Sequence, residues 1–263
     1  MSNVEVITVA THSEGNYENL IHNKHNVNIK VLGFGEKWRG LIMKYELVNK
    51  HIQDKEDDDI IIFIDGFDTV MCKDISSILT HFNSQDKKVI YSVDQVPDGI
   101  QKFIYDRVFY KKGNQVNINS GMYIGYVKYL KFILKDMLNR EFKSDQKATV
   151  HIYKQYDFIG ADEQEIMFKN KIMQTKMNIS ENDPPFVSFP GFIYPNRLYR
   201  CVFEYSQYFL DIYLGVFVLL SSIILYYKRY TFFILLGGIY IFIFYNMDKS
   251  GIKDKIKNNT IFY

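Results

Sequence analysis

Short apolar runs alternate with amphipathic stretches over residues 1–200. Runs rich in β-branched and aromatic residues predict strands over residues 4–10, 27–32, 60–64, 88–93 and 121–127. Apolar positions at helical spacing predict helices over residues 41–52, 75–82 and 128–138. Strands that alternate with helices predict an α/β domain with a largely parallel, doubly wound sheet covered by helices.

The strand predicted over residues 60–64 is entirely apolar, and the acids Asp65 and Asp68 follow it. A run without polar alternation is typical of a strand buried on both faces. Sheets of this class bind ligands at the carboxyl ends of such strands. Two carboxylates there, with Gly66 permitting close backbone approach, suit a divalent cation that holds a phosphate. Acids after strands also form turns and cap helices, so both interpretations stay open.

Other residues near the ends of the predicted strands have the chemistry that a nucleotide-sugar site needs. Thr11 follows the first strand, and the only tryptophan, Trp38, lies in a turn with two glycines after the second. Lys44 begins the next helix, from which its ammonium group can reach a phosphate as a point charge. The alternative is that the glycines only form a turn, that Trp38 anchors the core, and that Lys44 is a solvated helix residue.

Two later segments carry further polar groups. Asn119 precedes the strand predicted over residues 121–127, where its amide suits sugar hydroxyls and Gly121 leaves space for a ring. Residues 160–165 contain Asp162 and Glu163 and open a stretch of helical character. Acids in the first turn of a helix are favoured by its dipole. A carboxylate there also suits acceptor hydroxyls or positive charge developing at an anomeric carbon, so structural and catalytic roles stay open.

The character of the chain changes after residue 200. Residues 212–227 and 230–247 contain no charged side chain, and tyrosines gather at their ends. Each run is close to the roughly 17–25 residues that cross a bilayer, and interfacial tyrosines are typical of membrane helices. We expect domain 1–200 to be followed by a transmembrane hairpin within residues 201–249, with helices at about 208–227 and 230–247 and a polar tail at 250–263. Two buried core helices, or one span with a re-entrant segment, are the alternatives.

The charges that flank the two apolar runs give conflicting indications of the side of the membrane on which domain 1–200 lies. Lysines follow the second run and no signal peptide is visible at the N-terminus, which favours a cytoplasmic domain. Lys228 and Arg229, between the two runs, favour the lumenal alternative.

The net charge and the number of cysteines argue against two classes of protein, nucleic-acid-binding proteins and disulfide-rich proteins. The formal net charge is +2, from 32 basic and 30 acidic residues, and no basic stripe dominates residues 1–200. We therefore expect no nucleic-acid partner. Two cysteines are too few for a disulfide framework.

The order of the motifs resembles the glycosyltransferase domain of the procollagen lysyl hydroxylases. The resemblance covers about residues 4–195 and takes in V-I-T-V-A-T, V-L-G-F-G-E-K-W, I-I-I-F-I-D-G-F-D-T-V, N-S-G-M-Y-I-G-Y and A-D-E-Q-E-I-M-F. It implies a nucleotide-diphospho-sugar transferase fold of the GT-A type, with a Rossmann-like, mostly parallel sheet. It also implies transfer of glucose or galactose from a UDP-sugar to hydroxylysine or galactosyl-hydroxylysine on collagen-like chains.

The same resemblance implies roles for single residues. Asp65 and Asp68 would bind Mn²⁺, which holds the diphosphate of the UDP-sugar. The residues implied to line the UDP site are Thr11, Trp38, Lys44 and Phe67. Asp162 and Glu163 align with acids near the acceptor and the reacting sugar, and with Asn119 they form the expected catalytic group.

The chain departs from the family pattern at one metal ligand. The pattern has a histidine after the last strand, and Ser188 or Phe189 stands at that place here. Water or a substrate phosphate can fill the position, because hard cations accept oxygen ligands. Three hypotheses remain: a membrane-anchored UDP-sugar transferase, a non-catalytic domain that binds ligands or scaffolds partners, and a different metal-dependent phosphoryl-transfer enzyme.

Overall fold

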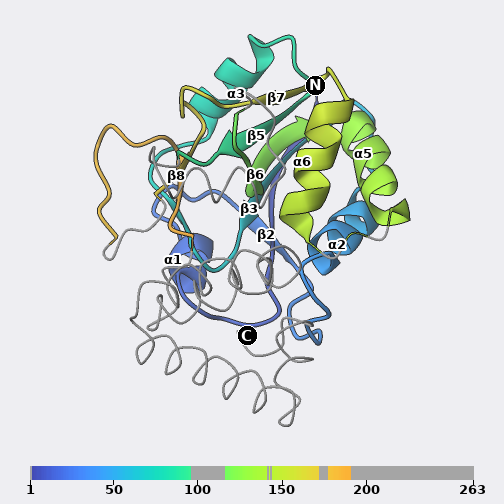
Figure 1. Ribbon diagram of the computed structural model, residues 1–263. Coiled ribbons are helices and arrows are strands. Elements are labelled where there is room, and N and C mark those ends of the chain that lie inside the picture. The colour runs from blue at the N-terminus through green and yellow to red at the C-terminus, as the bar shows by residue number, and fades with distance from the viewer. Residues whose placement is uncertain (1, 96–115, 141, 143, 172–176, 191–263) are drawn as a thin grey trace, which may run out of the picture. The chain divides into compact units, whose positions relative to one another are not determined.

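The structure is a computed structural model of the 263-residue chain and describes residues 2–95, 116–140, 142, 144–171 and 177–190 (Figure 1). These residues belong to the first of two compact units, Met1–Pro195. The second unit, Asn196–Tyr263, lies outside the described residues, and so do the predicted hairpin and tail. No helix within the described part of the chain has the length and apolar character needed to span a membrane.

A mixed sheet forms the centre of the domain. Its strands, in chain order, are β1 (Val4–Val9), β2 (Ile29–Leu32), β3 (Ile60–Asp65), β5 (Val89–Val93), β6 (Ile118–Tyr126) and β7 (Ile159–Ala161). They lie side by side in the order β2-β1-β3-β6-β5-β7. The β1/β2, β1/β3 and β5/β7 pairs are parallel, whereas β6 runs antiparallel to β3 and β5. The α/β class is confirmed, and the expected parallel sheet carries one reversed strand in its interior.

Helices cover both faces of this sheet. They are α1 (Tyr17–Ile21), α2 (Met43–Ile52), α3 (Ser76–Asn83), α5 (Val127–Asn139) and α6 (Asp145–Gln155). α2, α5 and α6 share one face, and α1 and α3 lie on the other (Figure 1). The three predicted helices correspond to α2, α3 and α5 with slightly shifted bounds. The helices α1 and α6 were not predicted from the sequence.

The side chains of β3 alternate between the two apolar layers. Ile61 and Phe63 pack with residues of α2, α5 and α6. Ile60, Ile62 and Ile64 pack with residues of α1 and α3. Because water reaches neither face, the strand needs no polar alternation, which is the physical reason for its unbroken apolar run. The prediction of a strand buried on both faces is confirmed.

A second sheet has three strands and was not predicted. They are β4 (Thr69–Met71), β8 (Phe168–Asn170) and β9 (Phe186–Ser188), in the order β4-β9-β8. β9 pairs antiparallel with β4 and parallel with β8. β4 begins directly after Asp68, so the acid-containing turn joins the main sheet to the small one.

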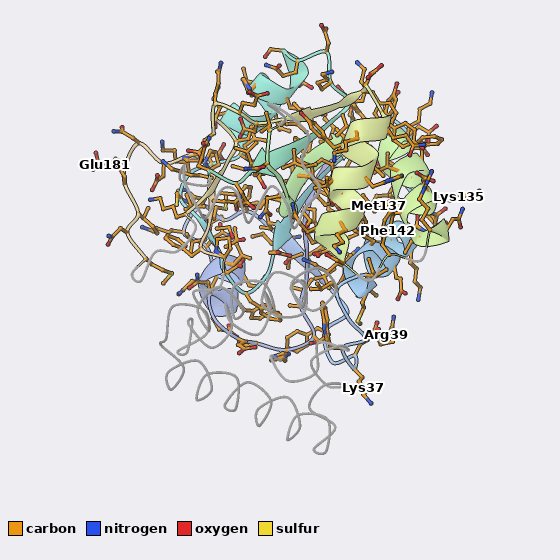
Figure 2. All side chains as sticks on the ribbon, in the orientation of Figure 1. Lys37, Arg39, Lys135, Met137, Phe142 and Glu181 are labelled. Carbon is orange, nitrogen blue, oxygen red and sulfur yellow. The ribbon has the colours of Figure 1, made fainter. Side chains whose placement is uncertain are left out.

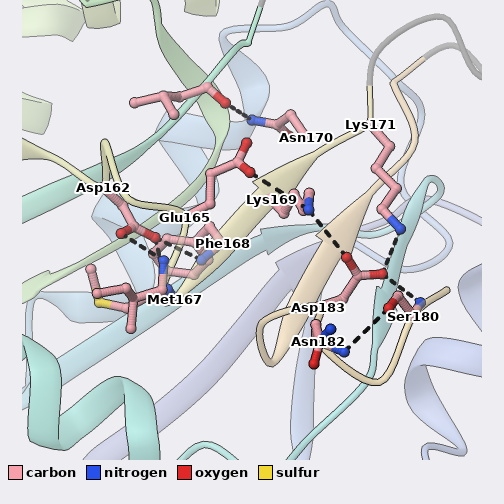
Figure 3. A network of polar contacts seen from close by, with 12 residues as sticks. Asp162, Glu165, Met167, Phe168, Lys169, Asn170, Lys171, Ser180, Asn182 and Asp183 are labelled. Atoms are coloured by element: carbon pink, nitrogen blue, oxygen red, sulfur yellow. Dashed lines mark hydrogen bonds and ion pairs between the residues drawn. The ribbon is translucent and has the colours of Figure 1, made fainter.

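The helical character expected from residue 165 onward is wrong. Glu165 has a φ of +51°, and strand β8 follows. The carboxylate of Asp162 accepts hydrogen bonds from the backbone N–H groups of Ile166, Met167 and Phe168, at 3.0, 2.8 and 2.8 Å (Figure 3). These bonds stabilise a turn, and the chain leaves it as a strand instead of a helix.

A buried carboxylate, Asp183, fastens the turn before β9 to β8. Its side chain is 2% exposed and pairs with Lys169 at 3.3 Å and Lys171 at 2.5 Å (Figure 3). Its Oδ2 also accepts the backbone N–H of Ser180 at 2.7 Å. Burial opposes ionisation, but the bonds from Lys171, Ser180 and Lys169 bring the pKa of Asp183 below its ordinary value.

We predict that Asp183→Asn lowers the free energy of unfolding by about 3 kcal/mol near neutral pH, because two lysines lose their buried partner. The pKa of Asp183 is depressed in the folded state, so its contribution is present above the unfolded value of 3.8 and is lost as pH falls below it. Urea unfolding at neutral and acidic pH measures both effects. Glu181→Gln, an exposed acid in the same turn, is the control. Equal stability of Asp183→Asn and the wild type at neutral pH would contradict the prediction.

Candidate active site

The carboxyl end of β3 and the beginning of β6 meet at one edge of the main sheet. Ile64 pairs with Met122, which places Asp65 beside Gly121. A Cβ atom at Gly121 would lie 2.7 Å from Asp65 Oδ2 and 2.9 Å from Asn119 Oδ1. Since both distances are too short for a real Cβ, only glycine fits between these two groups. The structure therefore brings the predicted site residues Asp65 and Asn119 together.

Lys44 lies between two carboxylates. Its Nζ is 2.9 Å from Asp65 Oδ1 and 2.7 Å from Asp145 Oδ2, and the residue is only 7% exposed. Asp145 was not predicted from the sequence as a site residue. Ser144 followed by an acid is a helix-start signal and was available to predict α6. No local pattern, however, shows that Asp145 meets a lysine from a distant helix.

Two sets of contacts fix the first turn of α6 against its neighbours. The side chain of Gln146 accepts the backbone N–H of Ser120 at 2.9 Å and donates to the carbonyl of Ile118. The hydroxyl of Tyr45, on α2, donates to the carbonyl of Asp145 at 3.2 Å. These contacts fix the first turn of α6, and with it Asp145, against the start of β6 and against α2, the helix that carries Lys44.

Asn119 is held in a single orientation. Its Oδ1 accepts the backbone N–H of Gly121 at 2.6 Å, and its Nδ2 donates to Asp94 Oδ1 at 2.9 Å. Asp94 directly follows β5, is 9% exposed, and was also missed from sequence. The ends of β3 and β5 and the start of β6 thus place two acids and an amide along one sheet edge.

Asp68 is held by the strand β9. The hydroxyl of Ser188 donates to Asp68 Oδ1 at 3.1 Å, and the backbone N–H of Phe189 donates to the carbonyl of Asp68 at 2.8 Å. The sequence left open which of these two residues replaces the expected histidine. The structure places Ser188's hydroxyl on the acid, whereas the Phe189 ring packs with Val70 and Val187.

The pKa of Asp65 depends on the charged groups around it. Burial raises the pKa of Asp65, the ammonium of Lys44 opposes the rise, and the carboxylates of Asp68 and Asp145 add to it, so that the pKa lies at about 6. Asp65 and Asp145 both pair with Lys44, and added positive charge beside Asp65 would stabilise its ionised form. Among the described residues, no group of three or more histidines, cysteines and acids is placed to hold a metal. A cation here would need oxygen atoms from a ligand as well as from Asp65 and Asp68.

The loops that follow β1 and β3 lie against each other. The backbone N–H of Asn16 donates to the carbonyl of Phe67 at 2.7 Å, and the rings of His12 and Phe67 are 5.2 Å apart. Thr11 is buried, with its Oγ1 3.0 Å from His12 Nδ1. Two of the predicted UDP-site residues, Thr11 and Phe67, are therefore linked through His12.

Trp38 lies in the loop between β2 and α2. It is half-buried and packs against the apolar cluster of α2, α5 and α6. Its neighbours Lys37 and Arg39 project outward from the same loop (Figure 2). The loop is tied to the first strand because the backbone N–H of Gly35 donates to the carbonyl of Thr11 at 2.9 Å.

Asp162 and Glu163 differ in their surroundings. Asp162 is 3% exposed, and both of its carboxylate oxygens accept backbone hydrogen bonds in the turn before β8. Glu163 is exposed. Of the two acids, Glu163 is the one whose carboxylate is accessible to a ligand.

Comparison with known proteins assigns the chain to a family. The family model described as "PLOD GT domain" matches residues 1–181. The chain belongs to the PLOD GT-domain family. This glycosyltransferase-domain family is the one that the sequence motifs indicated, and that assignment is confirmed.

Named relatives of this PLOD GT domain are longer proteins. Human procollagen-lysine,2-oxoglutarate 5-dioxygenase 2 is 27% identical over 163 residues, which are 56% of this chain and 22% of that protein. The Caenorhabditis elegans multifunctional procollagen lysine hydroxylase and glycosyltransferase is 27% identical over 162 residues, with the same shares. The match thus spans about a fifth of the length of these relatives.

Two solved structures are similar at low identity. A glycosyltransferase involved in glycosylation of the major capsid of PBCV-1 is 13% identical with a TM-score of 0.47, covering 75% of this chain and 96% of that one. The galactosyltransferase LgtC, in complex with donor and acceptor sugar analogs, is 10% identical with a TM-score of 0.44, covering 77% and 94%. The family assignment rests on the family model alone.

We predict that Asp65→Asn stabilises the PLOD GT domain at about pH 7.5 by roughly 1–2 kcal/mol. The folded-state pKa is raised from 3.8 to about 6, so ionisation of Asp65 costs stability as pH rises through this window. Lys44 keeps Asp145 as its partner in the variant. Urea unfolding gives the comparison, and the advantage of the variant should disappear below about pH 4. A variant less stable than the wild type at about pH 7.5 would contradict the raised pKa of Asp65.

Proposed function

We propose that the chain is a glycosyltransferase that moves a hexose, glucose or galactose, from a UDP-sugar to a hydroxyl group of a protein or glycan acceptor. The observation that supports this most is the meeting of Asp65, Lys44 and Asn119 at one sheet edge of a PLOD GT domain. The relatives are named for procollagen lysine. The resemblance of the motifs makes hydroxylysine or galactosyl-hydroxylysine of collagen-like proteins the proposed acceptor class.

Asp65 and Asp68 fit a divalent cation, which we propose to be Mn²⁺. Carboxylate oxygens are ligands that hard cations prefer, the glycine at position 121 keeps side-chain atoms away from Asp65 Oδ2, and the carboxylates of Asp68 and Asp145 favour added positive charge beside Asp65. Such an ion, when bound, would hold the diphosphate and stabilise negative charge on the UDP leaving group.

The chain's own residues would bind and orient the substrates. The buried ammonium of Lys44 holds the Asp65 carboxylate from one side. The proposed nucleotide-lining residues are Thr11, Trp38, Lys44 and Phe67. The fixed amide of Asn119 is the proposed contact to a sugar hydroxyl, because its hydrogen bonds to Gly121 and Asp94 preorganise it.

The acceptor side is assigned to Glu163. Its exposed carboxylate follows β7, and the buried carboxylate of Asp162 is already engaged by the backbone. We propose that Glu163 binds the acceptor hydroxyl or stabilises positive charge that develops at the anomeric carbon. Asp162 would support it by fixing the turn.

We also propose that residues 201–249 anchor domain 1–200 to a membrane as a two-helix hairpin. The support is the absence of charge in residues 212–227 and 230–247 and the tyrosines at their ends. The lysines after the second run support a cytoplasmic domain, and a lumenal domain is the alternative.

The double variant Asp65→Asn with Asp68→Asn should lose metal-dependent turnover of UDP-sugars, because both proposed cation ligands are neutralised. The measurement is release of UDP from UDP-glucose and UDP-galactose with Mn²⁺ and candidate acceptors. Asp157→Asn, an exposed acid outside the site, is the control and should keep wild-type turnover. Wild-type turnover in the double variant would rule out the two acids as the cation site.

Asp162→Asn should lower the stability of the protein, whereas Glu163→Gln should lower its turnover. Asparagine cannot accept as well from three backbone N–H groups, so Asp162→Asn should lower the free energy of unfolding by about 1–3 kcal/mol. Glu163→Gln should keep wild-type stability and UDP affinity but lower kcat by about 100-fold. Unfolding curves and steady-state kinetics separate the two. Full turnover in Glu163→Gln would remove this residue from the reaction.

A further inference from the structure

Ser188 occupies a rigid position beside Asp68. Its hydroxyl donates to Asp68 Oδ1 at 3.1 Å, and the residue is 4% exposed. Its backbone is fixed from both sides, since it pairs with Thr69 of β4 and Asn170 of β8. The backbone N–H of Lys171 also donates to its carbonyl at 2.8 Å. The backbone that carries the hydroxyl is therefore fixed, and the hydroxyl of this buried residue lies against the Asp68 carboxylate.

We infer that Ser188 is a positioning residue that orients Asp68 for the divalent cation. This inference rests on the proposed function, because the cation belongs to that proposal. An ionised carboxylate only accepts hydrogen bonds, so the serine hydroxyl must donate, and it thereby fixes the rotation of the Asp68 carboxylate. Groups that orient metal ligands in this way typically change metal affinity by about 10–100-fold when removed.

The strand that carries Ser188 is anchored away from the site. Asp183 pairs with Lys171, and Lys171 in turn bonds Ser188 through the backbone. On the other side, the backbone N–H of Phe189 bonds the carbonyl of Asp68. The turn containing Asp68 is thus held to β9 by one side-chain and one backbone hydrogen bond. Loss of the Ser188 hydroxyl would remove its bond to the Asp68 carboxylate and leave the backbone bond in place.

Thr69 offers a matched control in the same pair of strands. It lies opposite Ser188, is fully buried, and its hydroxyl has no hydrogen-bond partner within the described residues. Thr69→Val removes a hydroxyl from the same small sheet at nearly constant volume. If the role of Ser188 were only packing or sheet stability, the two positions would respond alike.

The test is titration of the full chain with Mn²⁺ alone, with free Mn²⁺ measured by electron paramagnetic resonance. We expect Ser188→Ala to bind Mn²⁺ about 10–100-fold more weakly than the wild type. Thr69→Val should bind like the wild type. Unchanged affinity in Ser188→Ala would overturn the role of Ser188 alone. Absence of Mn²⁺ binding by the wild type would overturn the metal part of the proposed function, and this inference with it.

A second pair of variants guards against misfolding of Ser188→Ala. Ser188→Thr keeps the hydroxyl, and Ser188→Val has the shape of threonine without it. Thermal unfolding shows that each variant is folded before titration. Near-wild-type affinity in Ser188→Thr with weaker binding in Ser188→Val supports the inference. Equal Mn²⁺ affinity of the two variants overturns the inference, because threonine and valine have nearly the same shape and only threonine has the hydroxyl.

Discussion

The site depends on two carboxylates, those of Asp65 and Asp145, that share the buried ammonium of Lys44. Asp65 ends a strand that is apolar on both faces, and its charge is opposed by Lys44 but increased by Asp68 and Asp145. A folded protein gains no stability from such a group. A bound cation would stabilise the ionised form of Asp65, because it would oppose the effect of the neighbouring carboxylates.

The two proposed cation ligands lie where the chain passes from one sheet to the other. Asp65 is the last residue of β3 in the main sheet, and Asp68 directly precedes β4 in the small sheet. Gly66 permits this passage, because a Cβ there would lie 2.8 Å from Thr8 Oγ1. The main sheet and Lys44 hold the first acid, and β9 holds the second. The distance between the acids therefore depends on both sheets.

The strands β1, β2, β3, β5 and β6, the helices α2, α3 and α5, and the acid pair were predictable because local patterns determine them. An apolar run, helical spacing and acids at a strand end are all signals read within a few residues. Asp145 and Asp94 were not predictable, since each acts through a contact with a residue far away in the chain. The strand β8 was missed for a related reason. The turn before β8 is stabilised by three hydrogen bonds from backbone N–H groups to the Asp162 carboxylate. The residues after this turn have helical spacing, so the sequence indicated a helix there.

We propose above all that Asp65 and Asp68, at the carboxyl end of β3, bind a divalent cation and that this cation binds the diphosphate of UDP. Calorimetric titration of the full chain with UDP, in the presence and absence of Mn²⁺, tests it most directly. We expect UDP to bind with Mn²⁺ and to bind at least about 100-fold more weakly without it, because the diphosphate would then face uncompensated carboxylates. Equal UDP affinity with and without Mn²⁺, or no binding under either condition, would contradict the claim.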